Sequence, residues 1–111
     1  MGLDTRVNCC PDGLVTDRKR RIKVLDCTIR DGGICNQWGF DHGVVRRVFE
    51  ALVASGLDYM EVGYKTTDGL FNRSEVGPWR FCDESDLAQV IRPSPLKIAT
   101  MVDLGRISPE D

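Results

Sequence analysis

The chain has 111 residues, of which 41% are hydrophobic and 29% charged, so its length fits one ordinary domain with a modest core. Its net charge of −2 gives no reason to expect nucleic acid or an anionic membrane as a partner. Because no apolar run approaches the ~20 residues that span a bilayer, and no secretory signal opens the chain, we expect a cytoplasmic protein.

The cysteines argue against a disulfide scaffold or a zinc knuckle. There are five of them, an odd number, and no two have CxxC spacing. Cys9 and Cys10 are too close in sequence for an ordinary disulfide, which leaves a metal or redox role as the open alternative for that pair. We expect Cys27 to be a small core residue.

Residues 1–21 predict an irregular leader. Pro11, Asp12 and Gly13 interrupt any regular element, and the basic run Arg18–Arg21 follows. In a slightly acidic chain, this run is interpreted as the solvated entry to the first strand, with a nucleic-acid or targeting patch as the alternative.

The first strand is predicted over residues 22–29, where apolar and β-branched residues dominate. Alternation would direct Asp26, Thr28 and Arg30 to one face and would turn Cys27 toward covering helices. Arg30–Gly33 then reads as a sharp turn at the strand end, which is where α/β proteins bind ligands. The alternative is an amphipathic strand with a solvated polar face.

A loop over residues 34–40 should lead to a helix and a second strand. Asp41 is a suitable N-cap, apolar residues then recur at helical spacing through Ser55, and Gly56 ends the helix. The second strand is predicted over residues 57–64, with Glu61 and Gly63 on one face and Tyr64 on the other.

Glu61 is a carboxylate in the middle of a buried strand, which is costly unless the charge is paired. The neighbouring parallel strand offers Arg30 near its end, so the sequence predicts an ion pair between the two side chains. The alternative is that this pair is structural and merely fixes the packing.

The remaining elements complete a third βα unit. Residues 65–83 predict a long loop that would face the substrate or a second subunit, with a plain surface insertion as the alternative. A short helix should begin at Asp83 or Ser85 and end before Pro93, and a third strand should span residues 96–102 with Asp103 at its end. Residues 108–111 have the signature of a helix start.

Three βα units make an open parallel sheet, whereas a complete (β/α)8 barrel needs about 250 residues. The sequence therefore predicts an α/β fold that is the N-terminal (β/α)3 portion of a TIM barrel, with the leader at 1–21 and a partial barrel domain at 22–111. A small self-contained three-layer α/β domain is the alternative.

Two motifs carry a resemblance to a known family. Asp26-Cys27-Thr28-Ile29-Arg30-Asp31-Gly32 resembles the D-x-T-x-R-D-G signature of the DRE-type TIM-barrel metallolyases, also called pyruvate carboxyltransferase-like proteins. Met60-Glu61-Val62-Gly63-Tyr64 resembles the second-strand Glu motif of that superfamily. Within this superfamily, the chain is most similar to aldolase catalytic domains of the 4-hydroxy-2-oxovalerate aldolase type. The similarity lies in the first motif, in Asn36, Trp38 and Phe40 after it, and in residues 97–103.

The resemblance implies roles for a few positions. Asp31 would be a ligand of a divalent metal (Mn, Mg or Zn), Arg30 would stabilise an enolate oxygen, and Glu61 would hold Arg30 in place. Asn36, Tyr64 and Asp103 are expected to contact a small 2-oxo acid substrate.

Other features of the sequence depart from the family pattern. The His-x-His pair that supplies two further metal ligands in the family has no counterpart, since the one histidine is His42, interpreted as a surface residue at a helix start. Gly33-Ile34 also lacks the Gln found in the synthases and in HMG-CoA lyase. We therefore expect no securely bound metal and no activity from these residues alone.

The functional expectation is part of a metal-dependent carbon–carbon lyase that acts on 2-oxo acids, completed by the rest of a barrel or by a partner in a homo-oligomer. One alternative is an acyl-CoA-dependent condensing enzyme of the 2-isopropylmalate or homocitrate synthase type. The other is a non-catalytic remnant or interaction module that buries its open sheet in a partner.

Overall fold

The computed structural model describes residues 22–103, 105, 107 and 110. Its centre is a three-stranded parallel sheet in the order β1 (Leu25–Asp26), β2 (Tyr59–Lys65) and β3 (Lys97–Val102). The leader at 1–21, with Cys9, Cys10 and the basic run, lies outside the described residues, as does most of the helix-start signal at 108–111.

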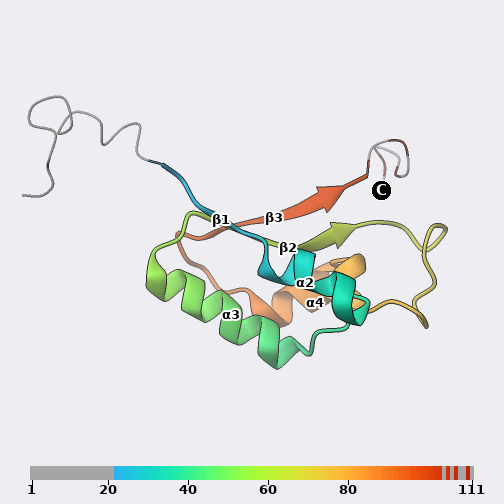
Figure 1. The fold of residues 1–111 in the computed structure, drawn as a ribbon, viewed down its shortest axis with the longest axis horizontal. Coiled ribbons are helices and arrows are strands. Elements are labelled where there is room, and N and C mark those ends of the chain that lie inside the picture. Colours follow the sequence, from blue (N-terminus) through green and yellow to red (C-terminus); the bar gives the residue numbers. More distant parts are fainter. Residues whose placement is uncertain (1–21, 104, 106, 108–109, 111) are drawn as a thin grey trace, which may run out of the picture.

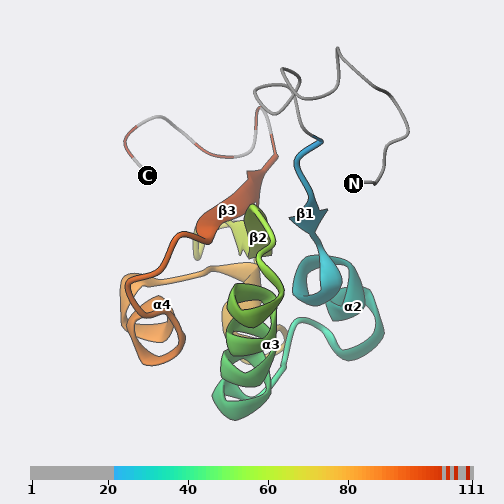
Figure 2. The same cartoon turned by 90° about the vertical axis from the view of Figure 1, so that its left-hand side faces the viewer.

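The helices all lie on one face of this sheet, as Figure 2 shows. In chain order they are α2 (Thr28–Asn36), α3 (His42–Ser55), the 3-10 turn η3 (Pro78–Arg80) and α4 (Glu84–Val90). Figure 1 shows α2 at the carboxyl end of β1, with α3 running alongside the strands. The described part of the chain leaves the other face of the sheet without a covering layer, so the architecture is α/β with an open parallel sheet.

Helix α3 follows its sequence signals closely. The Asp41 side chain accepts a hydrogen bond from the Gly43 amide at 2.8 Å, and Gly56 ends the helix with φ of 75°. Val45 and Phe49, one turn apart, are buried against the sheet. None of the described helices is long and apolar enough to cross a membrane.

The core lies between β2 and the helices. Met60 and Val62 of β2 are fully buried there, together with Trp79 of η3. Helices α2, α3 and α4 and the segments next to η3 and β3 supply the other members of the cluster: Ile29, Val45, Phe49, Val90, Cys82 and Leu96. Burial of this apolar surface supplies most of the stabilisation that a domain of this size has available.

The prediction of a long first strand was wrong. Strand β1 has only two residues, and residues 28–36 form α2, so Arg30 and Asp31 lie on a helix rather than in a turn. The Asp26 carboxylate accepts bonds from the Thr28 amide (3.1 Å) and hydroxyl (2.7 Å) and thereby supports this helix start. Gly33 lies inside the helix, where a Cβ atom would overlap the indole of Trp38.

The predicted alternation along β2 was wrong beyond Glu61. Glu61 pairs with Ala99 and Gly63 with Thr100, so Val62 is an extra residue and β2 is bulged. The bulge reverses the faces: Gly63 packs under the Trp79 carbonyl and Cys82, on the core side. Tyr64 therefore shares the uncovered face with Glu61.

The connection from β2 to α4 is only partly a surface loop. Residues 68–70 and 72–75 are exposed, but Trp79, Phe81 and Cys82 are at most 2% exposed. Burial raises the pKa of the Cys82 thiol to about 12. The second half of this connection is therefore part of the core. It carries Arg80, which lies between Trp79 and Phe81 and is also buried.

Candidate functional site

The candidate site lies at the carboxyl end of the strands, around Arg30 in the first turn of α2. The Arg30 Nε donates to Glu61 Oε1 at 2.7 Å, and its Nη1 donates to Asp31 Oδ1 at 2.6 Å. The contact between Arg30 and Glu61 predicted from the sequence is therefore present. Arg30 reaches Glu61 from helix α2, which begins at the carboxyl end of β1, and not from a neighbouring strand.

The electrostatics of this cluster follow from its burial. The side chains of Arg30 and Glu61 are 19% and 12% exposed, whereas that of Asp31 is 63% exposed. The hydrogen bond to Glu61 raises the pKa of Arg30, and the Glu61 charge adds to this effect. Arg30 is therefore a fixed cation with one anchored side and one side near solvent.

Cys27 was predicted to be a small core residue, but the structure places it at this site. It is the N-cap residue of α2, it is half-buried, and its thiol lies beside Glu61 and Arg30. Burial raises the pKa of this thiol, and so does the neighbouring Glu61. Because α2 begins at Thr28, Cys27 faces the ion pair instead of the helices.

Trp38 fixes the far end of α2 to the site. Its Nε1 donates to the backbone carbonyl of Arg30 at 2.8 Å, and its ring lies edge-to-face with Tyr64 at 5.6 Å. Gln37 and Trp38 both adopt positive φ (58° and 56°), which turns the chain back so that the indole reaches Arg30.

A second cation, Arg80, meets two of the residues predicted to bind substrate. Its guanidinium carbon lies 3.8 Å from the centroid of the Tyr64 ring, and its Nη2 lies 3.3 Å from Asp103 Oδ2. Asn36, the third predicted residue, is exposed at the end of α2 and lies about 9 Å along the helix axis from Arg30. The structure thus gathers Tyr64 and Asp103 around Arg80 and leaves Asn36 apart.

His42 begins α3, as predicted, but it is less exposed than a surface position implies. Its Nε2 lies 2.8 Å from Asp86 Oδ1 of α4, and its ring tilts against Trp79 at 5.5 Å. These contacts join α3 to α4 below the sheet, so His42 is placed to stabilise helix packing.

A divalent metal would need more ligands than the described residues supply. Asp31 carries the exposed carboxylate beside Arg30, and no group of three or more His, Cys, Asp or Glu side chains within residues 22–103, 105, 107 and 110 could hold an ion. Asp31 can be one ligand at most. The described residues therefore do not form a complete metal centre by themselves.

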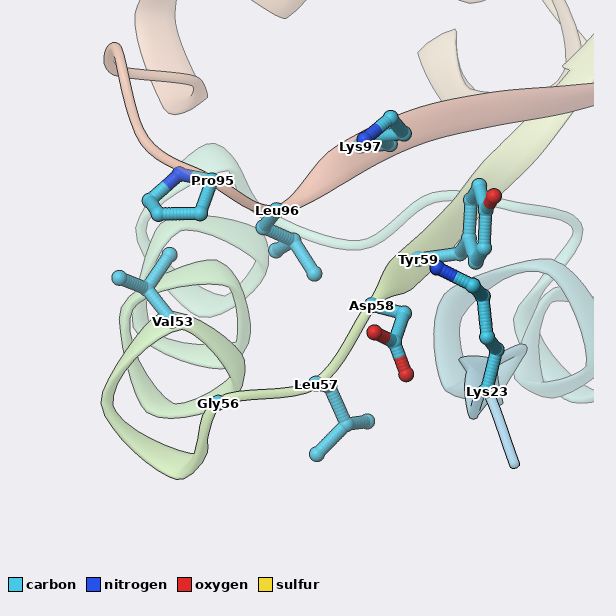
Figure 3. Close-up of a pocket in the computed structure, with 9 residues that line it drawn as sticks. All are labelled: Lys23, Val53, Gly56, Leu57, Asp58, Tyr59, Pro95, Leu96 and Lys97. Atoms are coloured by element: carbon cyan, nitrogen blue, oxygen red, sulfur yellow. The ribbon is translucent and has the colours of Figure 1, made fainter. Parts of the chain in front are cut away.

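A pocket lies at the opposite end of the sheet and is not part of this site. It has a volume of about 290 Å³ and lies where β2 and β3 begin. Figure 3 shows Lys23, Asp58 and Lys97 around it, with Leu57 and Leu96 on its apolar side. In parallel α/β folds, ligands bind at the carboxyl ends of strands, which favours the Arg30 edge.

Comparisons with known proteins agree with an aldolase-like fold. The chain is 32% identical over 101 residues to oxaloacetate decarboxylase from Mycobacterium tuberculosis, a match that covers 88% of the chain. It also resembles the crystal structure of the N-terminal domain of a candidate aldolase from Bacteroides vulgatus, with a TM-score of 0.63 and 32% identity over 81% of the chain. No family model matches the chain.

Both matches cover a minor part of the other protein. The chain spans 30% of the oxaloacetate decarboxylase and 29% of the Bacteroides protein. Both names describe carbon–carbon bond chemistry in those proteins, one by removal of a carboxyl group and one by aldol reaction.

Proposed function

We propose that this chain forms part of a lyase site that cleaves or forms a carbon–carbon bond in a 2-oxo acid. The observation that carries the proposal is the Arg30 guanidinium, held by Glu61 at 2.7 Å and by Asp31 at 2.6 Å at the carboxyl edge of a parallel sheet. The similarity to an oxaloacetate decarboxylase and to an aldolase supports the same class of reaction.

The chemistry requires an electrophile next to the 2-oxo group. When the bond between C3 and C4 of a 2-oxo acid breaks, its electron pair forms the enolate of C2 and C3, whose negative charge lies on the former oxo oxygen. C4 leaves as carbon dioxide if it was a carboxylate, or as a carbonyl compound if it carried a hydroxyl group that has lost its proton. Arg30 keeps N–H donors beyond those bound by Glu61 and Asp31, because a guanidinium has five. Donors fixed before the reaction stabilise such an oxyanion without reorganisation.

Glu61 acts through Arg30, so its role is positioning. Its carboxylate is mostly buried on β2, a rigid strand, and it fixes the Nε edge of the guanidinium. The Cys27 thiol lies beside the same carboxylate, and burial raises the pKa of this thiol. An anchored cation loses little conformational freedom when the substrate binds.

We also propose that the open face of the sheet is covered by further parallel strands, as in a TIM barrel. Tyr59, Glu61 and Tyr64 lie on this face, where strands from the rest of a barrel or from a second copy of the chain would pack. Such a layer would enclose Glu61 and exclude water from the Arg30 edge.

In a completed protein, Asp31 would be one ligand of Mg²⁺, Mn²⁺ or Zn²⁺, and the metal would supply a Lewis acid beside the oxo group. With Mn²⁺ as the probe, we expect paramagnetic broadening of amide signals in the first turn of α2, and Asp31→Asn should abolish it. Asp68→Asn is the matched control, because Asp68 is likewise an exposed aspartate paired with an arginine. Equal broadening in both variants would refute the ligand assignment.

Oxalate tests the proposed role of Arg30, because it mimics the planar enolate of a 2-oxo acid. We expect Arg30→Met to weaken oxalate binding about tenfold or more, since a charged hydrogen bond is lost. The affinity is measured from chemical-shift titrations of the labelled chain. Arg46→Met, which removes an exposed arginine bonded to the Gln89 carbonyl, should bind oxalate like the wild type. Unchanged affinity in Arg30→Met would contradict the proposal.

A further inference from the structure

The Arg80 side chain is the most buried cation of the described chain, with 6% of its surface exposed. Three aromatic rings surround its guanidinium carbon, those of Tyr64 at 3.8 Å, Phe71 at 4.1 Å and Trp38 at 5.2 Å. Contacts with ring faces stabilise a cation in place of water. They do not satisfy N–H groups that point outward in the plane of the guanidinium.

Two of the three nitrogens of this guanidinium lack a hydrogen-bond partner. Nε and Nη1 are both buried and unpaired within the described residues, and Nη2 makes one long bond, 3.3 Å, to Asp103. Burying a charged group without hydrogen bonds is costly, and a hydrophobic side chain of similar size would avoid the cost. Buried donors without a partner are rare in folded proteins, so these two nitrogens call for a partner that the described residues do not supply.

Arg80 belongs to the same edge of the sheet as Arg30. The η3 turn that carries it is bonded to the end of α2, through the Gly77 amide to the Gln37 carbonyl (2.7 Å) and the Trp79 amide to the Trp38 carbonyl (3.3 Å). Trp38 contacts both arginine residues, since its Nε1 donates to the backbone carbonyl of Arg30 and its ring lies beside the guanidinium of Arg80. The site therefore has two positively charged side chains and one tryptophan between their segments.

We propose that Arg80 binds a second carboxylate of the substrate, which makes the substrate a 2-oxo dicarboxylate. This inference rests on the proposed function, in which Arg30 receives the 2-oxo end. A carboxylate oxygen supplies the acceptors that Nε and Nη1 lack, and arginine is the cation best suited to it. Phe71, on the exposed part of the connection, swings off the guanidinium to admit the ligand.

A matched pair of probes tests this directly. 2-Oxoglutarate and 2-oxopentanoate have the same carbon chain and differ only in the terminal carboxylate. In the wild-type chain, we expect 2-oxoglutarate to bind at least about tenfold more tightly than 2-oxopentanoate. We also expect 2-oxoglutarate, but not 2-oxopentanoate, to shift the Arg80 Nε–H signal. Chemical-shift titration measures both quantities in one experiment.

Variants then assign the preference to Arg80. Arg80→Met should bind the two acids equally, and Arg80→Lys should keep part of the preference because it keeps the charge. Arg73→Met is the matched control: Arg73 lies in the same connection, packs on Phe81 and pairs with Asp68 and Asp83, so its loss should leave the preference intact. Thermal melts establish that each variant is folded.

The possible failures are distinct. Equal binding of both acids by the wild-type chain, or a preference that survives in Arg80→Met, would overturn the carboxylate site even if Arg30→Met still weakened both acids. A preference lost in Arg80→Met while Arg30→Met binds normally would uphold the carboxylate site and overturn the role of Arg30. If neither acid bound to the wild-type chain, both proposals would fall.

Discussion

Gly63→Ala is expected to destabilise the protein by more than about 3 kcal/mol, because the added methyl group has no space beside η3. A Cβ atom at this position would overlap the carbonyl oxygen of Trp79 and would lie 3.0 Å from Cys82 Sγ. The carbonyl is backbone, so η3 would have to move away from β2 and would expose the fully buried Trp79. Urea denaturation measures the loss as a lower midpoint.

Gly69→Ala is the control for this substitution. Gly69 lies in the exposed half of the same connection, and the nearest atom to an added Cβ is Thr67 Oγ1 at 3.9 Å. We expect its unfolding midpoint to match the wild type. If Gly63→Ala unfolded at the same urea concentration as Gly69→Ala, the close approach of η3 to the bulged strand would be disproved.

Glu61→Gln should reduce both the stability of the protein and its affinity for oxalate. Glutamine keeps the size of the side chain and one acceptor oxygen, but it removes the negative charge that faces the mostly buried Arg30 at 2.7 Å. A bond to a charged partner contributes about 1.5–3 kcal/mol, so we expect a loss of about 2 kcal/mol in unfolding free energy. Oxalate affinity should fall about tenfold because Arg30 loses its anchor.

The control for the charge change is Glu50→Gln on α3, an exposed position. Surface substitutions of this kind change stability by less than about 0.5 kcal/mol. Wild-type stability and oxalate affinity in Glu61→Gln would mean that Arg30 is positioned by other contacts, such as those with Asp31 and Cys27.

Helices and strands whose hydrophobic residues recur at a regular spacing could be predicted from the sequence. Helix α3, with its Asp41 cap and its terminal Gly56, begins within one residue of its expected start, and β2 and β3 begin within two residues of theirs. In each case the local pattern and the tertiary packing favour the same structure. The pairing of Arg30 with Glu61 was also predictable, because a buried carboxylate requires a partner.

Helix α2 could not be predicted in the same way. Its sequence has β-branched residues at Thr28 and Ile29 and two consecutive glycines, which favour a strand and a turn. The helix is stabilised by contacts outside its own sequence, namely the bond from Arg30 to Glu61 of β2 and the burial of Ile29 in the core. The Asp26 carboxylate also accepts a bond from the Thr28 amide just before the helix. Tertiary packing here overrides local propensity, and Cys27 changes face as a result.

Two further features had weak signals in the sequence. A glycine within a strand indicates a bulge or a close backbone approach, and Gly63 marks both. Arg80 stands between two aromatic residues in a stretch predicted as a loop, a pattern compatible with a buried cation. Neither signal specifies the partner, because the rings of Tyr64 and Phe71 reach Arg80 only once the connection has folded.

In the proposed site, Glu61 acts on the substrate oxygen only through Arg30, and a double-mutant cycle on oxalate binding distinguishes this role from an independent one. The affinities of the wild type, Arg30→Met, Glu61→Gln and the double variant are measured under one condition. We expect Glu61→Gln to have almost no effect once Arg30 is absent, which gives a coupling of about 1 kcal/mol or more. Additive losses would show that the two residues act independently and would refute the positioning role of Glu61.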